Sequence, residues 1–325
     1  MASNLLADKV IGIDLGATNI KFGVVTTKGE IQDTWSIATN TDDHGCNIVT
    51  DIIESIQRWL TESGSDTSQF IGIGISSPGS IDIEAGAVKA AFNLGWDDEQ
   101  DVGPVIAEAL DLPVILDNDA NVLALGERWI GAGEEAPDVL FILLDSGVGG
   151  GVVAASRLIH GVAGAAGEVG HICVDRENGD QCTCGHYGCL ETVTSTRGIV
   201  QLAKRLAQGE AKDCIDTVDA IFQAALAGDE FCDTVVEKVA YYLGFACATV
   251  ADILNPSFIV IGGGVTQYGE FFRARIEKHF RQFAFPPVER STEIRFAALG
   301  ESGLILGAAN LALQLRRKMA LESLR

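Results

Sequence analysis

The segment Val10–Thr27 reads VIGIDLGATNIKFGVVTT and contains two apolar runs separated by a turn at Gly16. The runs predict two strands joined by a tight, glycine-containing turn. A second stretch, Phe141–Ala155 (FILLDSGVGGGVVAA), repeats the pattern of an apolar strand, an Asp-x-Gly turn and a valine-rich strand, with Asp14 and Asp145 at the same place in the two copies. Because the copies lie more than a hundred residues apart, we expect two related α/β lobes rather than a solenoid.

Strands and helices alternate along the rest of the chain. After the first two strands the sequence predicts a strand, a helix, a strand, a helix, a strand and a helix, at 31–39, 48–60, 70–77, 105–112, 114–119 and 120–130. In the second half we expect helices and then strands at about 193–208, 214–227, 230–254, 258–264 and 293–299. The last helix, from about Ser302, has no strand after it, so we expect it to cross back to the first lobe. The predicted lobes are therefore a small one, 1–118 with 303–325, and a large one, 119–302.

The composition limits the class of protein. The chain has 325 residues, 47% apolar and 21% charged, which is typical of a globular protein. Its formal net charge of −22 argues against nucleic acid, which needs a basic surface. The first strand begins by Lys9 and the uncharged runs fall short of the ~20 residues that span a bilayer, so we expect neither a secretory signal nor a membrane partner. Cysteines outside one cluster are scattered, which favours a soluble protein of the reducing cytoplasm.

Three glycine-rich turns, DLGATNIK, DSGVGGG and IGGGV, are suited to bind an anion through converging backbone N–H groups. The alternative for any one of them is a plain hairpin turn. None matches a P-loop or the Gly-x-Gly-x-x-Gly of a dinucleotide fold. Taken together they resemble the ATPase superfamily of actin, sugar kinases and heat-shock chaperones. That resemblance implies an actin-like, ribonuclease-H-like fold, with duplicated α/β lobes around a cleft and turns that grip ATP phosphates from both sides.

The predicted strand at 114–119 ends in Asp117, Asn118 and Asp119, just before a predicted helix. The carboxyl ends of strands border the ligand site of an α/β lobe, which places these side chains there. Helix capping is the alternative, since Asp and Asn are favoured N-caps. Capping needs one such residue rather than three, so a carboxylate remains to accept a hydroxyl proton during phosphoryl transfer.

One short segment, His171–Glu191, holds four of the eight cysteines and two of the five histidines. His171, Cys182, Cys184 and Cys189 form a Cys3His set, which favours a closed, structural zinc site. The alternatives are chance clustering of thiols and His186 as the fourth ligand. A metal-bound imidazole has its other nitrogen fixed as a donor. With the carboxylates of Glu168 and Glu191 nearby in sequence, His171 is suited to bind the hydroxyl groups of a sugar, although Glu and His are also common surface residues.

These motifs resemble the ROK family (repressors, uncharacterised frames and sugar kinases), and within it the bacterial ATP-dependent glucokinases. The resemblance covers nearly the whole chain, and its most specific part is GEVGH with CTCGHYGCLE. It implies that Asp119 is the catalytic base. It also implies a hexose site that is lined by Gly79, Asn93, Asn118, Asp119, Glu168, His171 and Glu191. The nucleotide would bind at the glycine turns, with Asp14, Gly16, Thr18, Lys21, Ser146, Gly147, Gly149 and Gly263.

The second phosphate turn departs from the family pattern. The family reads Gly-Thr-Gly where this chain has Asp145, Ser146 and Gly147. Ser146 replaces the threonine hydroxyl, whereas Asp145 adds a negative charge that is tolerable if it faces Mg²⁺ or its waters. ATP is the expected phosphoryl donor, with polyphosphate or ADP as alternatives.

The resemblance thus implies an enzyme that transfers the γ-phosphoryl of Mg·ATP to the 6-hydroxyl of glucose. The expected ligands are glucose, ATP, Mg²⁺ and a structural Zn²⁺, and the expected assembly is a homodimer. Kinases for mannose, fructose, N-acetylglucosamine or N-acetylmannosamine are the nearest alternatives. A sugar-sensing repressor is another, but such repressors carry an N-terminal helix-turn-helix, and here a strand begins by Lys9. A chaperone-like or filament-like ATPase would not need the zinc segment.

Overall fold

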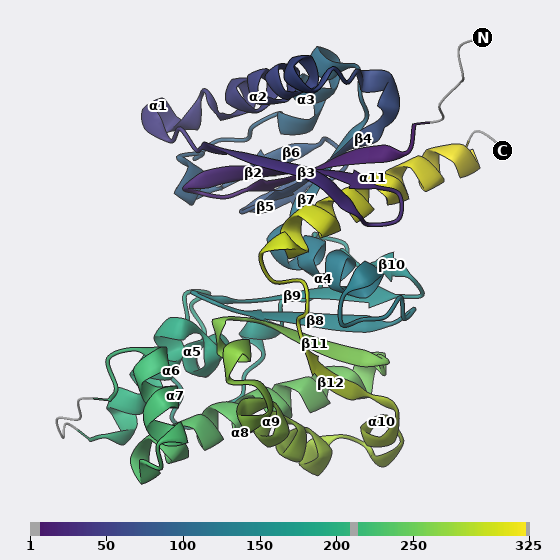
Figure 1. The fold of residues 1–325 in the computed structure, drawn as a ribbon. Coiled ribbons are helices and arrows are strands. Elements are labelled where there is room, and N and C mark those ends of the chain that lie inside the picture. Colours follow the sequence, from purple (N-terminus) through teal and green to yellow (C-terminus); the bar gives the residue numbers. More distant parts are fainter. Residues whose placement is uncertain (1–6, 209–213, 323–325) are drawn as a thin grey trace. The chain divides into compact units, whose positions relative to one another are not determined.

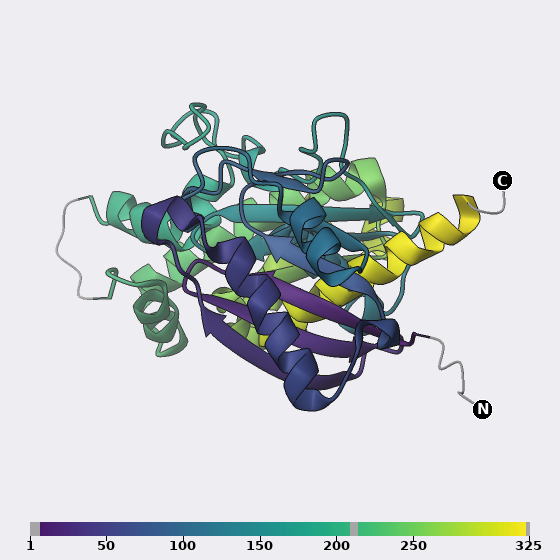
Figure 2. The same cartoon turned by 90° about the horizontal axis from the view of Figure 1, so that it is seen from above.

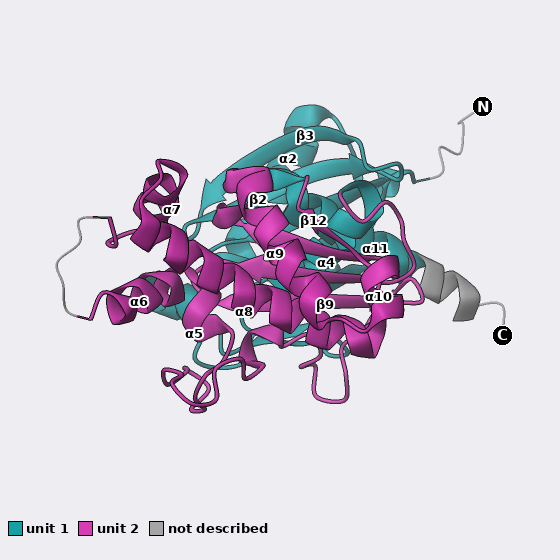
Figure 3. Cartoon of the chain, turned by 90° about the horizontal axis from the view of Figure 1, so that it is seen from below, with its two compact units in different colours: residues 1–131, 299–325 teal, residues 132–298 magenta. Residues whose placement is uncertain are grey.

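The computed structural model describes residues 7–208 and 214–322, which form two compact units (Figure 3). Unit 1 comprises residues 1–131 and 299–325, and unit 2 comprises residues 132–298. The first boundary therefore lies after α4 (Asp119–Ile130) and not before it, because α4 packs against the last helix, α11 (Gly303–Glu322), in unit 1. Helix α11 lies in unit 1, where it packs on β1 (Lys9–Leu15) and β4 (Phe70–Ser77).

Unit 1 is built on a five-stranded sheet in the order β3-β2-β1-β4-β7. Its first three strands are antiparallel, and β4 and β7 continue the sheet in parallel. Successive residues of β1 point to opposite faces of the sheet, and both faces are buried. Ile11 and Ile13 belong to the hydrophobic cluster on one face, and Val10 belongs to the cluster on the other. The strands are β1 (Lys9–Leu15), β2 (Asn19–Thr26), β3 (Ile31–Ala38), β4 (Phe70–Ser77) and β7 (Val114–Asn118).

Helices cover the two faces of this sheet differently (Figure 1). One face is covered by α2 (Ile48–Ser63) and α3 (Val102–Leu110), whose buried residues join those of β1 and β4. The other face is covered by α11, which runs across β1 and β4. Glycines at Gly12 and Gly74 allow this close approach, because a Cβ at either position would overlap a backbone carbonyl of α11.

Smaller elements of unit 1 connect the strands and helices. The hairpin of β5 and β6 follows β4, and short helical turns precede β4, α3 and α11. These elements are α1 (Asp42–Gly45), η1 (Thr67–Gln69), β5 (Ser80–Asp82), β6 (Ala87–Lys89), η2 (Phe92–Leu94) and η5 (Gly300–Ser302).

Unit 2 repeats this plan with the sheet order β10-β9-β8-β11-β12. Again three antiparallel strands are followed by two parallel ones, so the predicted duplication holds at the level of strand order and direction. The strands are β8 (Val139–Leu144), β9 (Val148–Ala154), β10 (Arg157–Leu158), β11 (Phe258–Gly263) and β12 (Glu293–Phe296). The mixed α/β sheets of both units fit an actin-like ATPase fold.

The helices of unit 2 lie on one side of its sheet (Figure 1), with the long α8 packed against α9. Figure 2 shows the chain from above. Two predicted helices begin later than the sequence pattern indicated, because Ser195 and Thr217 act as N-caps that accept the backbone N–H of Gly198 and Ala220. The elements are η3 (Val169–His171), α5 (Glu191–Thr194), α6 (Thr196–Leu206), α7 (Val218–Leu226), α8 (Glu230–Leu254), η4 (Gly264–Tyr268), α9 (Gly269–Phe283) and α10 (Pro286–Ser291). Among the described helices of the whole chain, none combines the length and the apolar character that crossing a membrane requires.

Candidate active site and metal centre

The carboxyl ends of three neighbouring strands bring the acidic residues of unit 1 together. Asp14 at the end of β1 is paired with Ser76 of β4, and Ser76 is paired with Asp117 of β7. Asp119 follows directly, in the first turn of α4. The sequence placed Asp14 and Asp119 in different motifs, and the parallel register explains how they become neighbours.

The three polar residues at the end of β7 and the start of α4 have three different tasks. Asp117 is buried and its Oδ1 accepts hydrogen bonds from Asn118 N at 2.8 Å and Asn121 Nδ2 at 2.9 Å. Asn118 is the N-cap, since its Oδ1 accepts from Ala120 N at 3.0 Å. Capping therefore accounts for Asn118 and not for Asp119, as the sequence argument required.

Asp119 is held by a serine that the sequence reading missed. Ser76 Oγ donates a hydrogen bond to Asp119 Oδ1 at 2.6 Å. Burial raises the pKa of the Asp119 carboxyl, and the Ser76 hydrogen bond opposes part of that rise. A carboxylate that is less acidic than usual and fixed in direction is suited to accept a proton from a hydroxyl group. The sequence shows only that Ser76 lies at the end of a predicted strand, because its contact with Asp119 requires the register of β4 with β7.

Asp14 is the second carboxyl at this edge. Burial and the nearby charge of Asp119 raise the pKa of Asp14 to about 6, and Lys21, its cross-strand partner, acts in the opposite direction. Lys21 Nζ also lies 4.0 Å from Glu301 Oε2, a long and largely exposed ion pair. Burial makes the ionised form of the Asp14 carboxyl unfavourable, and a nearby cation offsets that free-energy cost. A carboxyl with a pKa of about 6 therefore binds a cation readily at neutral pH.

The first glycine turn is fixed by hydrogen bonds to Thr39. Gly16 N donates to Asn19 O at 3.2 Å, Thr39 Oγ1 donates to Gly16 O, and Thr39 N donates to Thr18 O. Thr18 itself is exposed. The turn thus has a defined shape and presents an exposed hydroxyl.

Two predicted sugar-binding residues of unit 1 follow β4. Gly79 has a positive φ of 92°, and a Cβ there would meet Lys89 O at 2.9 Å, so the turn requires glycine. Asn118 Nδ2 donates to Gly79 O at 3.3 Å, which joins this turn to the start of α4. Asn93 lies exposed in η2.

In unit 2 the other two glycine turns lie side by side. Strand β8 pairs with β11, with Leu144 opposite Gly263, so the turn after β8 and the turn after β11 are neighbours. A Cβ at Gly263 would overlap Leu144 O, and its φ is 106°. Gly147 and the exposed Ser146 form the turn after β8, and Gly149 lies at the start of β9. Asp145 is exposed and anchors this turn by its backbone, because Asp145 N donates to Gly147 O at 2.9 Å.

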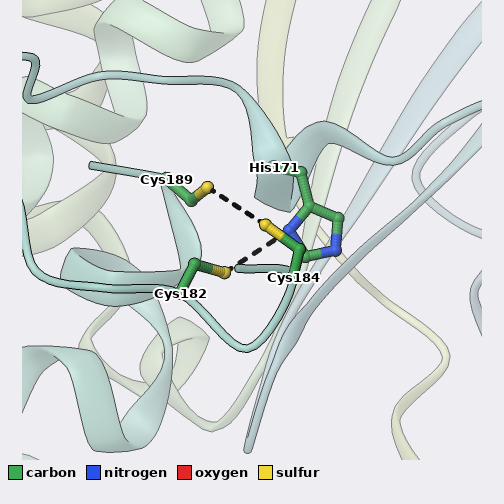
Figure 4. A group of neighbouring side chains, drawn as sticks. All are labelled: His171, Cys182, Cys184 and Cys189. Carbon is green, nitrogen blue, oxygen red and sulfur yellow. Dashed lines mark hydrogen bonds between the residues drawn. The ribbon is translucent and has the colours of Figure 1, made fainter. Parts of the chain in front are cut away.

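The four predicted metal ligands lie together, with donor atoms all within 4.8 Å of one another (Figure 4). Cys184 Sγ and Cys189 Sγ are 3.7 Å apart, and Cys182 Sγ lies 3.6 Å from His171 Nδ1. On one tetrahedral zinc, two sulfurs lie about 3.8 Å apart and a sulfur and a nitrogen about 3.6 Å apart, from bond lengths of about 2.3 and 2.1 Å. These distances fit one tetrahedral ion.

The competing ligand, His186, is also near the thiols but not in this group. Its Nδ1 lies 3.6 Å from Cys184 Sγ. Hydrogen bonds with the backbone and side chain of His186 lower the pKa of Cys184 to about 6. His186 thus favours the thiolate form of Cys184, which is the form that binds a metal.

Glu168 and Glu191 lie beside different members of the metal group, Glu168 beside His171 and Glu191 beside Cys182. His171 turns Nδ1 toward Cys182 and Nε2 toward Glu168, with Nε2 3.9 Å from Glu168 Oε2. Glu191 Oε1 accepts from Thr183 Oγ1 at 3.1 Å, and its Oε2 accepts from Val148 N at 3.2 Å. Glu191 therefore connects the cysteine segment to the glycine turn after β8. The role of Thr183 has no signal in the sequence.

Comparison with known proteins gives one family for nearly the whole chain. The model of the ROK family matches residues 10–315. A glucokinase of Halalkalibacterium halodurans is 43% identical over 318 residues, which are 95% of this chain and 96% of that protein. A glucokinase of Thermotoga maritima is 32% identical, with 93% of this chain and 96% of that protein covered.

A solved structure with bound ligands is also similar. It is a ROK family glucokinase from Streptomyces griseus in complex with glucose and AMPPNP, 31% identical, with a TM-score of 0.71, and the match covers 94% of this chain and 99% of that one. The family model, the sequence identities and the structural similarity agree. The chain belongs to the ROK family.

Proposed function

We propose that this protein is an ATP-dependent glucokinase, which transfers the γ-phosphoryl group of Mg·ATP to the 6-hydroxyl of glucose and releases ADP and glucose 6-phosphate, a substrate of glycolysis. The glucokinases described above support this assignment by identity over nearly the full chain. The observation that carries the chemistry is the hydrogen bond from Ser76 to Asp119 at the edge of the unit 1 sheet.

Asp119 is the proposed general base. As the phosphoryl group reaches the sugar oxygen, the hydroxyl proton passes to Asp119, with Oδ1 held by Ser76 and Oδ2 as the accepting atom. The raised pKa makes the carboxylate a better base than an exposed aspartate. Phosphoryl transfer depends mostly on positioning and charge neutralisation, so the base contributes only part of the rate.

We propose that the glycine turns of both units bind the nucleotide. Backbone N–H groups near Gly16, Gly147, Gly149 and Gly263 would bind phosphate oxygens, as converging amides do in other anion sites. The hydroxyl groups of Thr18 and Ser146 and the ammonium of Lys21 add donors, the two hydroxyls being exposed. Asp14 is the proposed carboxylate that faces Mg²⁺ or its waters, and its pKa of about 6 fits a group that a cation would ionise.

The proposed hexose ligands are Gly79, Asn93, Asn118, Asp119, Glu168, His171 and Glu191. Carboxylates accept hydrogen bonds from sugar hydroxyls, and an imidazole N–H or an amide donates to them. His171 Nε2, the nitrogen turned away from the thiols, is the atom proposed to face the sugar.

His171, Cys182, Cys184 and Cys189 are proposed to bind a structural zinc. When bound, the ion fixes the ring of His171 and the tautomer with hydrogen on Nε2. The sulfur–sulfur and sulfur–nitrogen distances support this choice. We further propose a cytoplasmic location, since eight free thiols suit a reducing compartment, and a homodimer, which only the family resemblance suggests.

The test is release of ADP from Mg·ATP with glucose, mannose, fructose, N-acetylglucosamine and N-acetylmannosamine in separate reactions. We expect the highest kcat/KM with glucose. A higher value with another hexose would transfer the assignment to that sugar, and no sugar-dependent release would exclude a hexose kinase. Repeating the assay with ADP and with polyphosphate tests whether ATP is the phosphoryl donor, the point on which Asp145 in the second phosphate turn bears.

A further inference from the structure

A second pair of cysteines lies outside the proposed metal centre. Cys214 precedes α7 and Cys232 lies in the first turn of α8. The Cys232 thiol donates toward Cys214 Sγ at 2.7 Å, and both cysteines are free. Neither residue has a part in the kinase chemistry proposed above.

The distance between these sulfurs distinguishes what the pair can do. Two thiolates on one tetrahedral zinc lie about 3.8 Å apart, and the sulfurs of Cys184 and Cys189 in the proposed zinc site lie 3.7 Å apart. At 2.7 Å the sulfurs of Cys214 and Cys232 are too close to share a tetrahedral ion. A disulfide bond of about 2.05 Å needs the sulfurs to approach by only about 0.7 Å more.

The surroundings give the two thiols different roles. Cys232 is fully buried and its backbone N–H donates to Asp229 Oδ1 at 2.7 Å, so this cysteine is held by the start of α8. Burial raises the pKa of Cys232. Cys214 is partly exposed, which makes it the thiol that a small molecule reaches first. An Asp229 carboxylate oxygen lies within 4.8 Å of both sulfurs.

We propose that Cys214 and Cys232 are a redox-active dithiol, which forms an intrachain disulfide by exchange with a small disulfide such as glutathione disulfide. First, the Cys214 thiolate attacks one sulfur of glutathione disulfide, a protein–glutathione bond forms, and one glutathione thiolate leaves. Next, Cys232 Sγ attacks Cys214 Sγ, the mixed disulfide breaks, and the second glutathione thiolate leaves. The protons of both protein thiols pass to water, that of Cys232 by way of the Asp229 carboxylate, and water returns two protons to the glutathione thiolates. The two protein thiols lose two electrons, and one glutathione disulfide becomes two glutathiones.

The disulfide would join the segment before α7 to the start of α8. Helix α7 supports the end of the third glycine turn, because Phe222 stacks on Tyr268 at 4.2 Å and Tyr268 OH donates to Asp219 Oδ1 at 2.8 Å. Tyr268 ends η4, which follows directly after Gly263. A disulfide that fixes the segment before α7 would therefore alter the position of the third glycine turn. Because that turn is proposed to bind ATP, this consequence rests on the proposed function.

The first experiment incubates the intact, zinc-loaded protein with glutathione disulfide and maps disulfides by peptide mass spectrometry. We expect a Cys214–Cys232 cross-link and a loss of two hydrogens from the chain. In Cys232→Ser we expect glutathione to remain on Cys214. Cys46→Ser, which removes an exposed thiol elsewhere, is the matched control and should cross-link like the wild type. Glutathione retained on Cys214 in the wild type, or no reaction at Cys214, would overturn the proposal.

The second experiment compares the melting temperature and the KM for ATP before and after oxidation. We expect a higher melting temperature, because the cross-link restricts the unfolded chain, and a change of about twofold or more in the KM for ATP. Cys214→Ser should show neither change and should retain its zinc. Cross-linking with an unchanged KM would overturn the link to the nucleotide turn. Absence of kinase activity in the reduced wild type would instead contradict the proposed function. The disulfide map does not depend on that activity and would still test the proposed dithiol.

Discussion

Ser76 Oγ lies 2.6 Å from Asp119 Oδ1 and joins the carboxyl end of β4 to the first turn of α4. The parallel register of β4 with β7 makes this contact possible, since Ser76 is opposite Asp117 and Asp119 follows two residues later. The hydrogen bond fixes the direction of a partly buried carboxylate and stabilises its ionised form. The catalytic proposal therefore depends on two residues, and each can be tested separately.

Asp119→Asn should lower kcat by ~10² or more, because the amide keeps the size of the side chain but cannot accept the hydroxyl proton. Glucose binding, measured by calorimetry or by thermal shift, should be largely retained. A variant with near-normal turnover would show that Asp119 is not the base.

Ser76→Ala should move the acidic limb of the pH–rate profile to higher pH. The Ser76 hydrogen bond lowers the pKa of Asp119 against the effect of burial, so its loss raises that pKa further. A base works only when deprotonated, and activity then appears at higher pH. At neutral pH we expect kcat/KM to fall by roughly tenfold, the cost of one hydrogen bond to a charged group. Ser77→Ala is the matched control, because Ser77 Oγ donates to Pro78 O instead. Equal shifts in both variants would rule out a specific role for Ser76.

Asp14→Asn should stabilise the ligand-free protein at neutral pH while it weakens nucleotide binding. The folded-state pKa of Asp14 is raised from 3.8 to about 6, so folding favours its protonated form. That contribution is fully present below the unfolded-state pKa and is lost as the pH rises through about 6. The neutral asparagine does not ionise, so the variant keeps this stability as the pH rises. We expect its free energy of unfolding to exceed that of the wild type by on the order of 3 kcal/mol at most at pH 7. Urea unfolding at pH 7 and at pH 4 checks this, since the gain should shrink markedly at the lower pH. A gain that is the same at both values would contradict the assignment.

The metal proposal predicts about one zinc per chain, because four ligands form one closed site. Cys184→Ala should lose the ion and, with it, much of the affinity for glucose, since His171 would no longer be held in one orientation. Cys173→Ser is the control, because Cys173 is an exposed thiol in the same segment but outside the group of four. Elemental analysis and glucose titration measure both effects. A zinc-free wild type, or full glucose affinity in a zinc-free Cys184→Ala, would count against the metal site.

Much of the fold follows from the sequence because its strands and turns carry strong local signals. The apolar runs around Gly16 and Gly147 predicted the two antiparallel pairs that begin the two sheets. The contact of α11 with β1 had a weaker signal. It depends on Gly12, whose missing Cβ becomes informative only when the carbonyl of Ile305 is known to lie above it. The sequence predicted the unit boundary before α4 rather than after it, because the packing of α4 on α11 is a long-range contact that a sequence does not show.

The candidate site shows the same division. The Cys3His group was predictable because its four ligands lie within one short stretch and their chemistry is distinctive. Ser76 was not predicted as a partner of Asp119, since the contact joins residues 43 positions apart and requires the strand register. The sulfur pair of Cys214 and Cys232 was read as two scattered thiols, because a sequence does not show that the segment before α7 meets the start of α8.

The most direct test of the account is the formation of glucose 6-phosphate by the zinc-loaded protein with glucose and Mg·ATP, measured together with ADP. Coupling to a dehydrogenase that accepts only the 6-phosphate identifies the position of the new phosphate. We predict one glucose 6-phosphate for each ADP and no ADP without sugar, because Asp119 activates the sugar hydroxyl rather than water. ADP formed without glucose, or ADP formed with glucose but no 6-phosphate, would contradict the account.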